Sequence, residues 1–149
     1  MTELDEKYDV DESFPMLMST CVKYMRESLN ARFMLNGCAI TSEQWMMLMY
    51  LSKQDGMSQQ HLADDCSISK VSALNLIKKL EKNNLLVRHP DPVDGRSNRV
   101  YLTSEGRKIQ RLLIPLAQKN TNKIAQGIAR EDIEQLKRTV KKMLCNLRV

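Results

Sequence analysis

The sequence predicts a mainly α-helical (α+β) fold, with a winged helix-turn-helix lobe at residues 39–103 set between long N- and C-terminal dimerisation helices. Three observations support this prediction. A short helix, a tight turn and a longer helix follow one another between residues 58 and 82, which is the order of a helix-turn-helix. Two short strands then flank a polar loop between residues 86 and 103. Finally, apolar residues recur at helical spacing near both ends of the chain.

The first helix is expected from Ser13 to about Asn36, where Asn36-Gly37 can end it. Thr41 then begins a second helix, with Gln44 three residues later as in a capping box. Residues 45–51 make this second helix apolar on nearly all sides. It should therefore lie at the centre of the lobe.

The helix-turn-helix follows directly. Ser58 caps a short helix that ends at about Asp64, and either Ser67 or Ser69 caps the next helix, which runs to Lys82 and stops at Asn83-Asn84. One side of this longer helix is apolar at positions 73, 76, 77 and 80. That side is the expected core face, so the opposite side is free to enter a DNA groove.

The two strands and their loop have the shape of a DNA-reading wing. Two prolines end the first strand, and Asp94-Gly95 is expected to supply the positive φ of a tight reversal. Arg96 is left at the tip, where a long guanidinium can enter a narrow minor groove. Asp94 and Gly95 are assigned a structural role, in which Asp94 shapes the turn or orients Arg96 or Arg99.

The residues expected to face DNA share the outer side of the longer helix or the wing. Asn75 can pair with adenine, Val71 can meet a thymine methyl group, and lysines can neutralise phosphates. For any one of these residues the alternative is a merely solvated surface. The full set is Ser69, Lys70, Val71, Ser72, Asn75, Lys78, Lys79, Arg96 and Arg99, with Arg88 as a further candidate for a backbone contact.

Two more helices are expected after the wing. Thr103 begins one that should bend or break near Pro115, because proline removes a backbone donor, and that should persist beyond this point. A last helix runs from about Glu131 to Leu147. Their apolar stripes, like that of the first helix, lie outside the compact lobe, and a second copy of the chain is the simplest cover. Residues 13–38 and 104–149 are therefore expected to form a helical dimerisation region, and the acidic residues 1–12 a flexible N-terminus.

Composition limits the classes of function. The net charge of +5 combines −5 in residues 1–12 with +10 in the rest, and a basic body suggests a polyanionic partner. No apolar stretch has bilayer length and no leader-like start is present, so we expect a cytoplasmic protein without a membrane partner. The four cysteines are scattered, which predicts reduced thiols, no metal and no cofactor. The sequence shows no paired carboxylates, no nucleophile with a base and no phosphate-cradling loop, so we do not expect an enzyme.

Several motifs together resemble a known family. They are Thr41-Ser42-Glu43-Gln44-Trp45, residues 56–63, residues 80–88, and Asp94-x-Arg96 followed by Leu102-Thr103-x-x-Gly106. This pattern resembles the MarR (multiple antibiotic resistance regulator) family from about Phe14 to Leu147. The chain departs from the family at Asn75, where Arg is frequent, and at Asn84, where Gly is usual.

The resemblance implies a function. It implies an obligate homodimer with interlocked first and last helices, which reads a pseudo-palindromic operator in double-stranded DNA. It also implies control by a small phenolic or hydrophobic effector, or by thiol oxidation, in a crevice between the dimer helices and the lobe. We therefore expect a homodimeric, sequence-specific transcriptional regulator that acts as a repressor.

Methionine-rich helices suggest where an effector would bind. Flexible methionine walls suit a hydrophobic ligand, although ordinary core packing is the alternative. The expected pocket residues are Met18, Cys21, Tyr24, Met25, Arg32, Trp45 and Met49. Two other functions stay open: a redox-sensing regulator that uses Cys21, and a winged-helix module that binds another protein instead of DNA.

Overall fold

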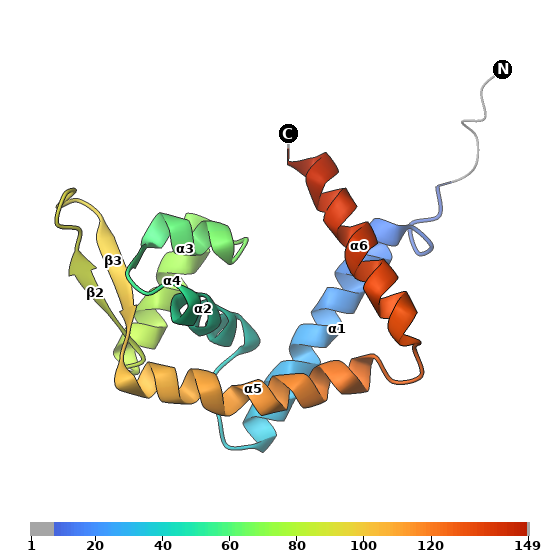
Figure 1. The fold of residues 1–149 in the computed structure, drawn as a ribbon, viewed down its shortest axis with the longest axis horizontal. Coiled ribbons are helices and arrows are strands. Elements are labelled where there is room, and N and C mark those ends of the chain that lie inside the picture. Colours follow the sequence, from blue (N-terminus) through green and yellow to red (C-terminus); the bar gives the residue numbers. More distant parts are fainter. Residues whose placement is uncertain (1–7, 149) are drawn as a thin grey trace.

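The computed structural model describes residues 8–148, and these form six helices and three short strands. The mainly helical winged fold predicted from the sequence is confirmed (Figure 1). In chain order the elements are α1 (Phe14–Leu35), α2 (Ser42–Lys53), β1 (Met57–Ser58), α3 (Gln59–Asp65), α4 (Lys70–Lys82), β2 (Leu86–Pro90), β3 (Asn98–Leu102), α5 (Ser104–Ile124) and α6 (Arg130–Leu147). The elements α2 to β3 form the lobe, and α5 leads from it to α1 and α6, which project together on the far side (Figure 1).

Side-chain caps set the helix starts. The capping box at α2 is complete, since Thr41 Oγ1 accepts from Gln44 N at 3.2 Å and Gln44 Oε1 accepts from Thr41 N at 2.9 Å. Ser69 caps α4 by accepting from Ser72 N, which decides between the two serines left open by the sequence. Ser67 instead adopts a positive φ of 55° in the turn before α4.

The sheet has one strand more than the sequence predicted. Its order is β1-β3-β2, antiparallel throughout, with Leu86 opposite Leu102 and Met57 opposite Val100. The two residues of β1 are too few to show an alternating pattern, so nothing in the sequence distinguished them from a turn.

The expected positive φ at Gly95 is wrong, since Gly95 is not among the described residues with positive φ. The strands are joined by the longer loop 91–97, which is held by side-chain acceptors rather than by a glycine conformation. Asp91 Oδ1 accepts from Val93 N at 2.8 Å and from Asp94 N at 3.0 Å, and Asp94 Oδ1 accepts from Arg96 N at 3.1 Å. These turns reverse the chain without left-handed backbone at Gly95.

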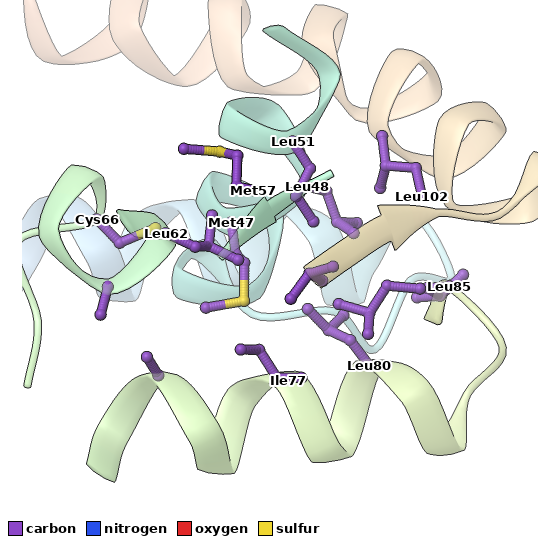
Figure 2. Close-up of a cluster of buried hydrophobic side chains, with 14 residues drawn as sticks. Met47, Leu48, Leu51, Met57, Leu62, Cys66, Ile77, Leu80, Leu85 and Leu102 are labelled. Atoms are coloured by element: carbon purple, nitrogen blue, oxygen red, sulfur yellow. The ribbon is translucent and has the colours of Figure 1, made fainter. Parts of the chain in front are cut away.

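The lobe has one hydrophobic core to which every layer contributes. Side chains from α2, α3, α4 and the sheet converge in it, as Figure 2 shows. The labelled members include Leu48 and Leu51 of α2, Ile77 and Leu80 of α4, and Leu102 of β3. This core fixes α4 and the wing relative to each other.

The N-terminal half of α5 packs with the lobe, contrary to the expectation that this helix lies outside it. Gly106, Gln110 and Leu113 are buried. A Cβ at Gly106 would lie 1.9 Å from the carbonyl oxygen of Leu85, so only glycine allows this close approach. The helix also continues through Pro115 without a break.

We call α1, the C-terminal half of α5 and α6 the arm. Large apolar side chains on α1 and α6 are exposed, with Leu147 at 78%, and no residue of α6 is buried. The expected flexible N-terminus falls partly outside the described residues, because residues 1–7 are not among them. None of the described helices combines the length and apolar character needed to cross a membrane.

Candidate nucleic-acid interface and effector crevice

The outer face of α4 is polar and free of the core. Ala73, Ile77 and Leu80 are buried, whereas the residues expected to face DNA are exposed and Val71 is 71% exposed. The exposed set on this helix is Lys70, Val71, Ser72, Asn75, Lys78 and Lys79. Ser69 lies just before the helix, and its hydroxyl is already engaged by Ser72 N and Ser72 Oγ. Its first task is therefore to hold the start of α4.

Arg96 projects from the wing without an ion pair to any of residues 8–148. Asp94 accepts from the backbone N–H of Arg96 and shapes the turn, and no contact to the Arg96 guanidinium accompanies it. An exposed cation at the end of a hairpin is free to meet a polyanion.

Arg99 is held at the base of the wing. Its Nε donates to Asp91 Oδ2 at 2.7 Å and its Nη1 donates to the Gly56 carbonyl oxygen at 3.0 Å. Asp91, not Asp94, therefore orients Arg99. The backbone N–H groups of Asp94 and Val93, together with Arg99, lower the pKa of the Asp91 carboxyl. Asp91 was missed in the sequence, although an aspartate between two prolines is a signal for a side-chain turn.

Arg88 also has partners within the chain. Its Nε and Nη2 donate to the two carboxylate oxygens of Glu81 at 3.1 and 2.9 Å, and its Nη1 donates to Gln59 Oε1 at 3.4 Å. The hydrogen bonds from Arg88 lower the pKa of the Glu81 carboxyl. Arg88 thus joins β2, the last turn of α4 and the start of α3, so its first role is to brace the interface.

A crevice lies where α1, α2 and α5 meet. A cavity of about 470 Å³ is lined by Met25, Trp45, Met49 and Ile114, and an adjoining one of about 380 Å³ shares Trp45 and Met49. Trp45 Nε1 donates to the Gln110 carbonyl oxygen at 3.1 Å, which fixes the indole between α2 and α5. We call these two cavities the crevice.

The expected effector residues do not form one pocket in a single chain. Met25, Trp45 and Met49 meet in the crevice, but Met18 lines a separate groove between α1 and α6. The remaining three lie elsewhere on α1: Tyr24 and Arg32 line a third hollow, and Cys21 is exposed. At about 100° per residue, neighbouring positions on α1 point to different sides, and the sequence did not reveal which side faces α2.

Two residues at the crevice were not singled out from the sequence. Arg26 of α1 and Glu43 of α2 line it and form an ion pair, with Arg26 Nη1 3.2 Å from Glu43 Oε1. A contact between residues so far apart in the chain has no local sequence signal.

The cysteines differ in environment. Burial, with a smaller contribution from Asp65, raises the pKa of the Cys66 thiol to about 11, so this thiol stays protonated and unreactive at neutral pH. His61 Nε2 lies 3.8 Å from Asp65 Oδ1 on the surface of α3. Residues 8–148 contain no group of three or more metal-ligating side chains of the His, Cys, Asp or Glu type.

A polar helix face beside a braced hairpin that carries an exposed arginine defines a winged-helix DNA-binding protein. Comparison with known proteins identifies the family. Residues 40–97 match the family model for the MarR family. The transcriptional regulator FarR of Neisseria gonorrhoeae is 31% identical over 114 residues, which cover 75% of this chain and 78% of FarR. The chain belongs to the MarR family of transcriptional regulators.

Solved structures agree with this assignment. A MarR-family transcriptional regulator from Silicibacter pomeroyi is similar with a TM-score of 0.75 and 26% identity, covering 95% of this chain and 94% of that one. MepR of S. aureus, solved as a complex with DNA, is similar with a TM-score of 0.79 and 25% identity over 90% of this chain and 98% of that one.

Proposed function

We propose that this chain is a homodimeric, sequence-specific repressor that binds a pseudo-palindromic DNA operator and is released by a small apolar effector. The observation that carries the proposal is the pairing of an exposed polar face on α4 with the wing residue Arg96, which forms no ion pair with any of residues 8–148. The helix would read base edges in the major groove through Asn75 and Ser72, while Arg96 enters the adjacent minor groove.

The internal contacts of the other wing arginines support this assignment. Arg88 and Arg99 hold the wing against α3, α4 and the turn before β1, so the groove-reading residues are presented on a rigid surface. Preorganisation lowers the entropic cost of binding. Because Arg88 and Arg99 are engaged within the chain, Arg96 is the arginine of the wing that we expect to contact DNA.

Dimerisation is supported by the arm. The groove between α1 and α6 has a volume of about 990 Å³, and Phe14, Met18, Val140 and Leu144 are among its lining residues. An apolar groove of this size on a single chain favours a second copy as its cover. Two lobes held about 34 Å apart would then meet successive major grooves on one side of the duplex.

Effector control is supported by the crevice, which lies between the arm and the lobe. Its walls are mostly apolar and include three methionines, Met25, Met46 and Met49, beside Trp45. A ligand that prefers one arrangement of arm and lobe would shift the population of dimers towards it. A dimer whose two α4 helices no longer match the spacing of successive major grooves would dissociate from the operator.

The test is selection of bound duplexes from a random pool, followed by titration of the selected operator with Arg96→Ala and with Arg130→Ala as an equally charged control on α6. We expect Arg96→Ala to weaken binding by at least about tenfold and to reduce the slope of log affinity against log salt by about one. The control should bind normally. Equal binding by both variants would overturn the role of the wing.

The same experiment separates the other functions. DNA binding through phosphate contacts should weaken strongly between about 50 and 200 mM salt. If no duplex is selected, or if the affinity for DNA does not change over this salt range, a protein-interaction module is favoured. Repeating the selection with oxidised and reduced protein tests redox sensing by Cys21. Loss of binding on oxidation, abolished by Cys21→Ser, would favour that alternative over an effector.

A further inference from the structure

We infer that Asp55, in the turn after α2, is a positioning residue for DNA binding. Together with Arg107 of α5 it holds the base of the wing, and in this way it sets where Arg96 meets the minor groove. This inference rests on the proposed function, in which Arg96 contacts DNA, and it adds a residue that acts on DNA only through the wing.

One carboxylate joins three elements at the base of the wing. Asp55 follows α2 closely, and its Oδ1 accepts from the backbone N–H of Leu102 at 2.9 Å. Its Oδ2 accepts from Arg107 Nη2 at 2.5 Å. Leu102 ends β3, and Arg107 lies in the first turn of α5. Asp55 therefore connects the end of α2 both to the strand that carries the wing and to the helix that follows it.

The next residue, Gly56, extends this connection along β3. Its N–H donates to the Val100 carbonyl oxygen at 2.9 Å. Met57 lies opposite Val100 in the antiparallel ladder of β1 and β3. The same register places Asp55 opposite Leu102, just before β1 begins. The Asp55 side chain therefore supplies a hydrogen-bond acceptor at a point of β3 that β1 does not reach.

The base of β3 sets the direction of the whole hairpin. β3 is the central strand of the sheet, and loop 91–97 lies at the end of the hairpin away from α5 (Figure 1). Strands rise about 3.3 Å per residue, so Arg96 lies roughly 20 Å along the hairpin from Leu102. A rotation of about 5° at the base would therefore move the guanidinium by more than about 1 Å, which is enough to break a hydrogen bond.

The ion pair favours one position of the wing without locking it. The side chains of Arg107 and Asp55 are 42% and 29% exposed, and partly exposed pairs contribute at most about a fivefold factor to an equilibrium. On the β2 side, the hairpin has a brace of its own in the Arg88–Glu81 pair. Loss of the Asp55–Arg107 pair should therefore loosen one side of the wing and leave the lobe folded around its core.

Arg107 also belongs to a cationic side of α5, which suggests a different role. A shallow hollow of about 630 Å³ there is lined by Ser104, Arg107, Lys108, Arg111, Leu112 and Pro115. If Arg107 bound phosphates directly, Asp55 would compete with DNA for it. Removal of the Asp55 charge would then strengthen operator binding. A positioning role predicts weaker binding, so the sign of the change separates the two roles.

The experiment is titration of the selected operator with variants of the pair in the full chain. Asp55→Asn keeps an oxygen acceptor for the Leu102 N–H but removes the charge, so it should weaken binding by about three- to fivefold. Arg107→Gln should have the same effect, and Arg107→Lys should restore most of the affinity. The controls Arg111→Gln and Glu105→Gln each remove one exposed charge from α5, and both should bind as wild type does.

A double variant separates positioning of Arg96 from a general loss of structure. Arg96→Ala removes the group that Asp55 positions, so adding Asp55→Asn to it should weaken operator binding no further. The random-pool selection should agree with this result. Asp55→Asn should reduce base preferences at the minor-groove positions beside each half-site and keep those that α4 reads in the major groove. A urea titration of each variant verifies that it is folded under the binding conditions.

Three results would overturn the positioning role while the proposed function stands. They are unchanged operator binding by both Asp55→Asn and Arg107→Gln, tighter binding by Asp55→Asn, and an equal loss on adding Asp55→Asn to wild type and to Arg96→Ala. If Asp55→Asn does not fold, Arg107→Gln and Arg107→Lys allow the same comparisons. A wild-type protein that selects no duplex would instead overturn the proposed function itself, and an Arg96→Ala variant that binds like wild type would overturn the role of the wing.

Discussion

The lobe and the arm bury their apolar side chains in different ways. In the lobe, α2, α3, α4 and the sheet close around one core, with Leu48, Ile77 and Val100 fully buried. In the arm, Phe33 is the buried residue of α1, and α6 has none. The helices of both regions carry apolar side chains at the same helical spacing. This spacing predicts that one side of each helix will be buried, but it does not tell whether the same chain or another molecule buries it.

This difference predicts two kinds of stability. The lobe should unfold with a free energy that does not depend on protein concentration. The proposed dimer would cover the apolar surface of the arm, so the stability of the arm should rise with protein concentration. The four predictions below test this contrast, from the largest expected effect to the smallest.

Gly106→Ala should damage the lobe most. The new Cβ would lie 1.9 Å from the Leu85 carbonyl oxygen, and a backbone atom cannot move aside as a flexible side chain can. We expect the free energy of unfolding to fall by at least about 3 kcal/mol at every protein concentration, measured by urea denaturation. Gly95→Ala is the control, because nothing lies within 4 Å of its added Cβ and Gly95 has no positive φ. Equal stability of the two variants would contradict the close packing of α5 on the lobe.

Leu144→Glu should separate the copies while leaving the lobe folded. Leu144 belongs to the apolar stripe of α6 and lines the groove beside α1. A charge there would have to be desolvated on association, so sedimentation equilibrium should show monomers. Operator affinity should fall by at least about 100-fold, since the two half-sites are no longer bound together.

Gln135→Glu adds the same charge on the opposite side of α6 and serves as the control. It should leave both the dimer and its operator binding intact. A dimeric Leu144→Glu variant would show that α6 does not form the interface.

Glu81→Gln should have a moderate, pH-dependent effect. The pKa of Glu81 is lowered from its ordinary value of 4.5 by the hydrogen bonds from Arg88. A lowered carboxyl pKa stabilises the fold above about pH 4.5, and this stabilisation is lost as the pH falls through the folded-state pKa. Because Glu81 is 37% exposed, solvent screening limits the loss at pH 7 to about 1 kcal/mol.

The measurement for this variant is a series of denaturant titrations between pH 7 and pH 3. The difference from wild type should shrink steadily below pH 4.5. A difference that stays constant with pH would mean that the ion pair is not its source.

Asn84→Gly should have the smallest effect. Asn84 has a φ of 58°, a conformation that glycine adopts without steric cost, but glycine also gains entropy in the unfolded chain. We expect a stabilisation of no more than about 0.5 kcal/mol in thermal unfolding. Asn83 has a φ of −89°, where glycine brings no steric relief, so Asn83→Gly should lower the stability of the protein.

Local signals in the sequence were sufficient for the helices. The capping box of Thr41, the serine caps and the glycine or asparagine stops act within a few residues of each other, so each of these helices could be predicted from its own segment. The core face of α4 followed from its apolar spacing for the same reason. The short strand β1 could not be predicted, because its pairing with β3 depends on a partner some forty residues away.

The candidate site was only partly predictable. The exposed face of α4 and the position of Arg96 followed from periodicity and turn residues. The partners of Arg88 and Arg99 did not, because an arginine has no local feature that tells an internal carboxylate from a phosphate. The effector residues were scattered over different sides of α1 because the direction of its neighbours is set by tertiary packing.

Cys66 gives the molecule a natural probe for opening of the lobe. Cys21 and Cys145 are exposed and Cys38 is half-buried, so alkylating reagents should modify these three thiols directly. Cys66 is buried in the lobe core, so its thiol should react only when that core opens, and its labelling rate would then report the opening. A mass-resolved alkylation time course would in this way follow local breathing of the DNA-reading half in the unmodified protein, with no engineered label.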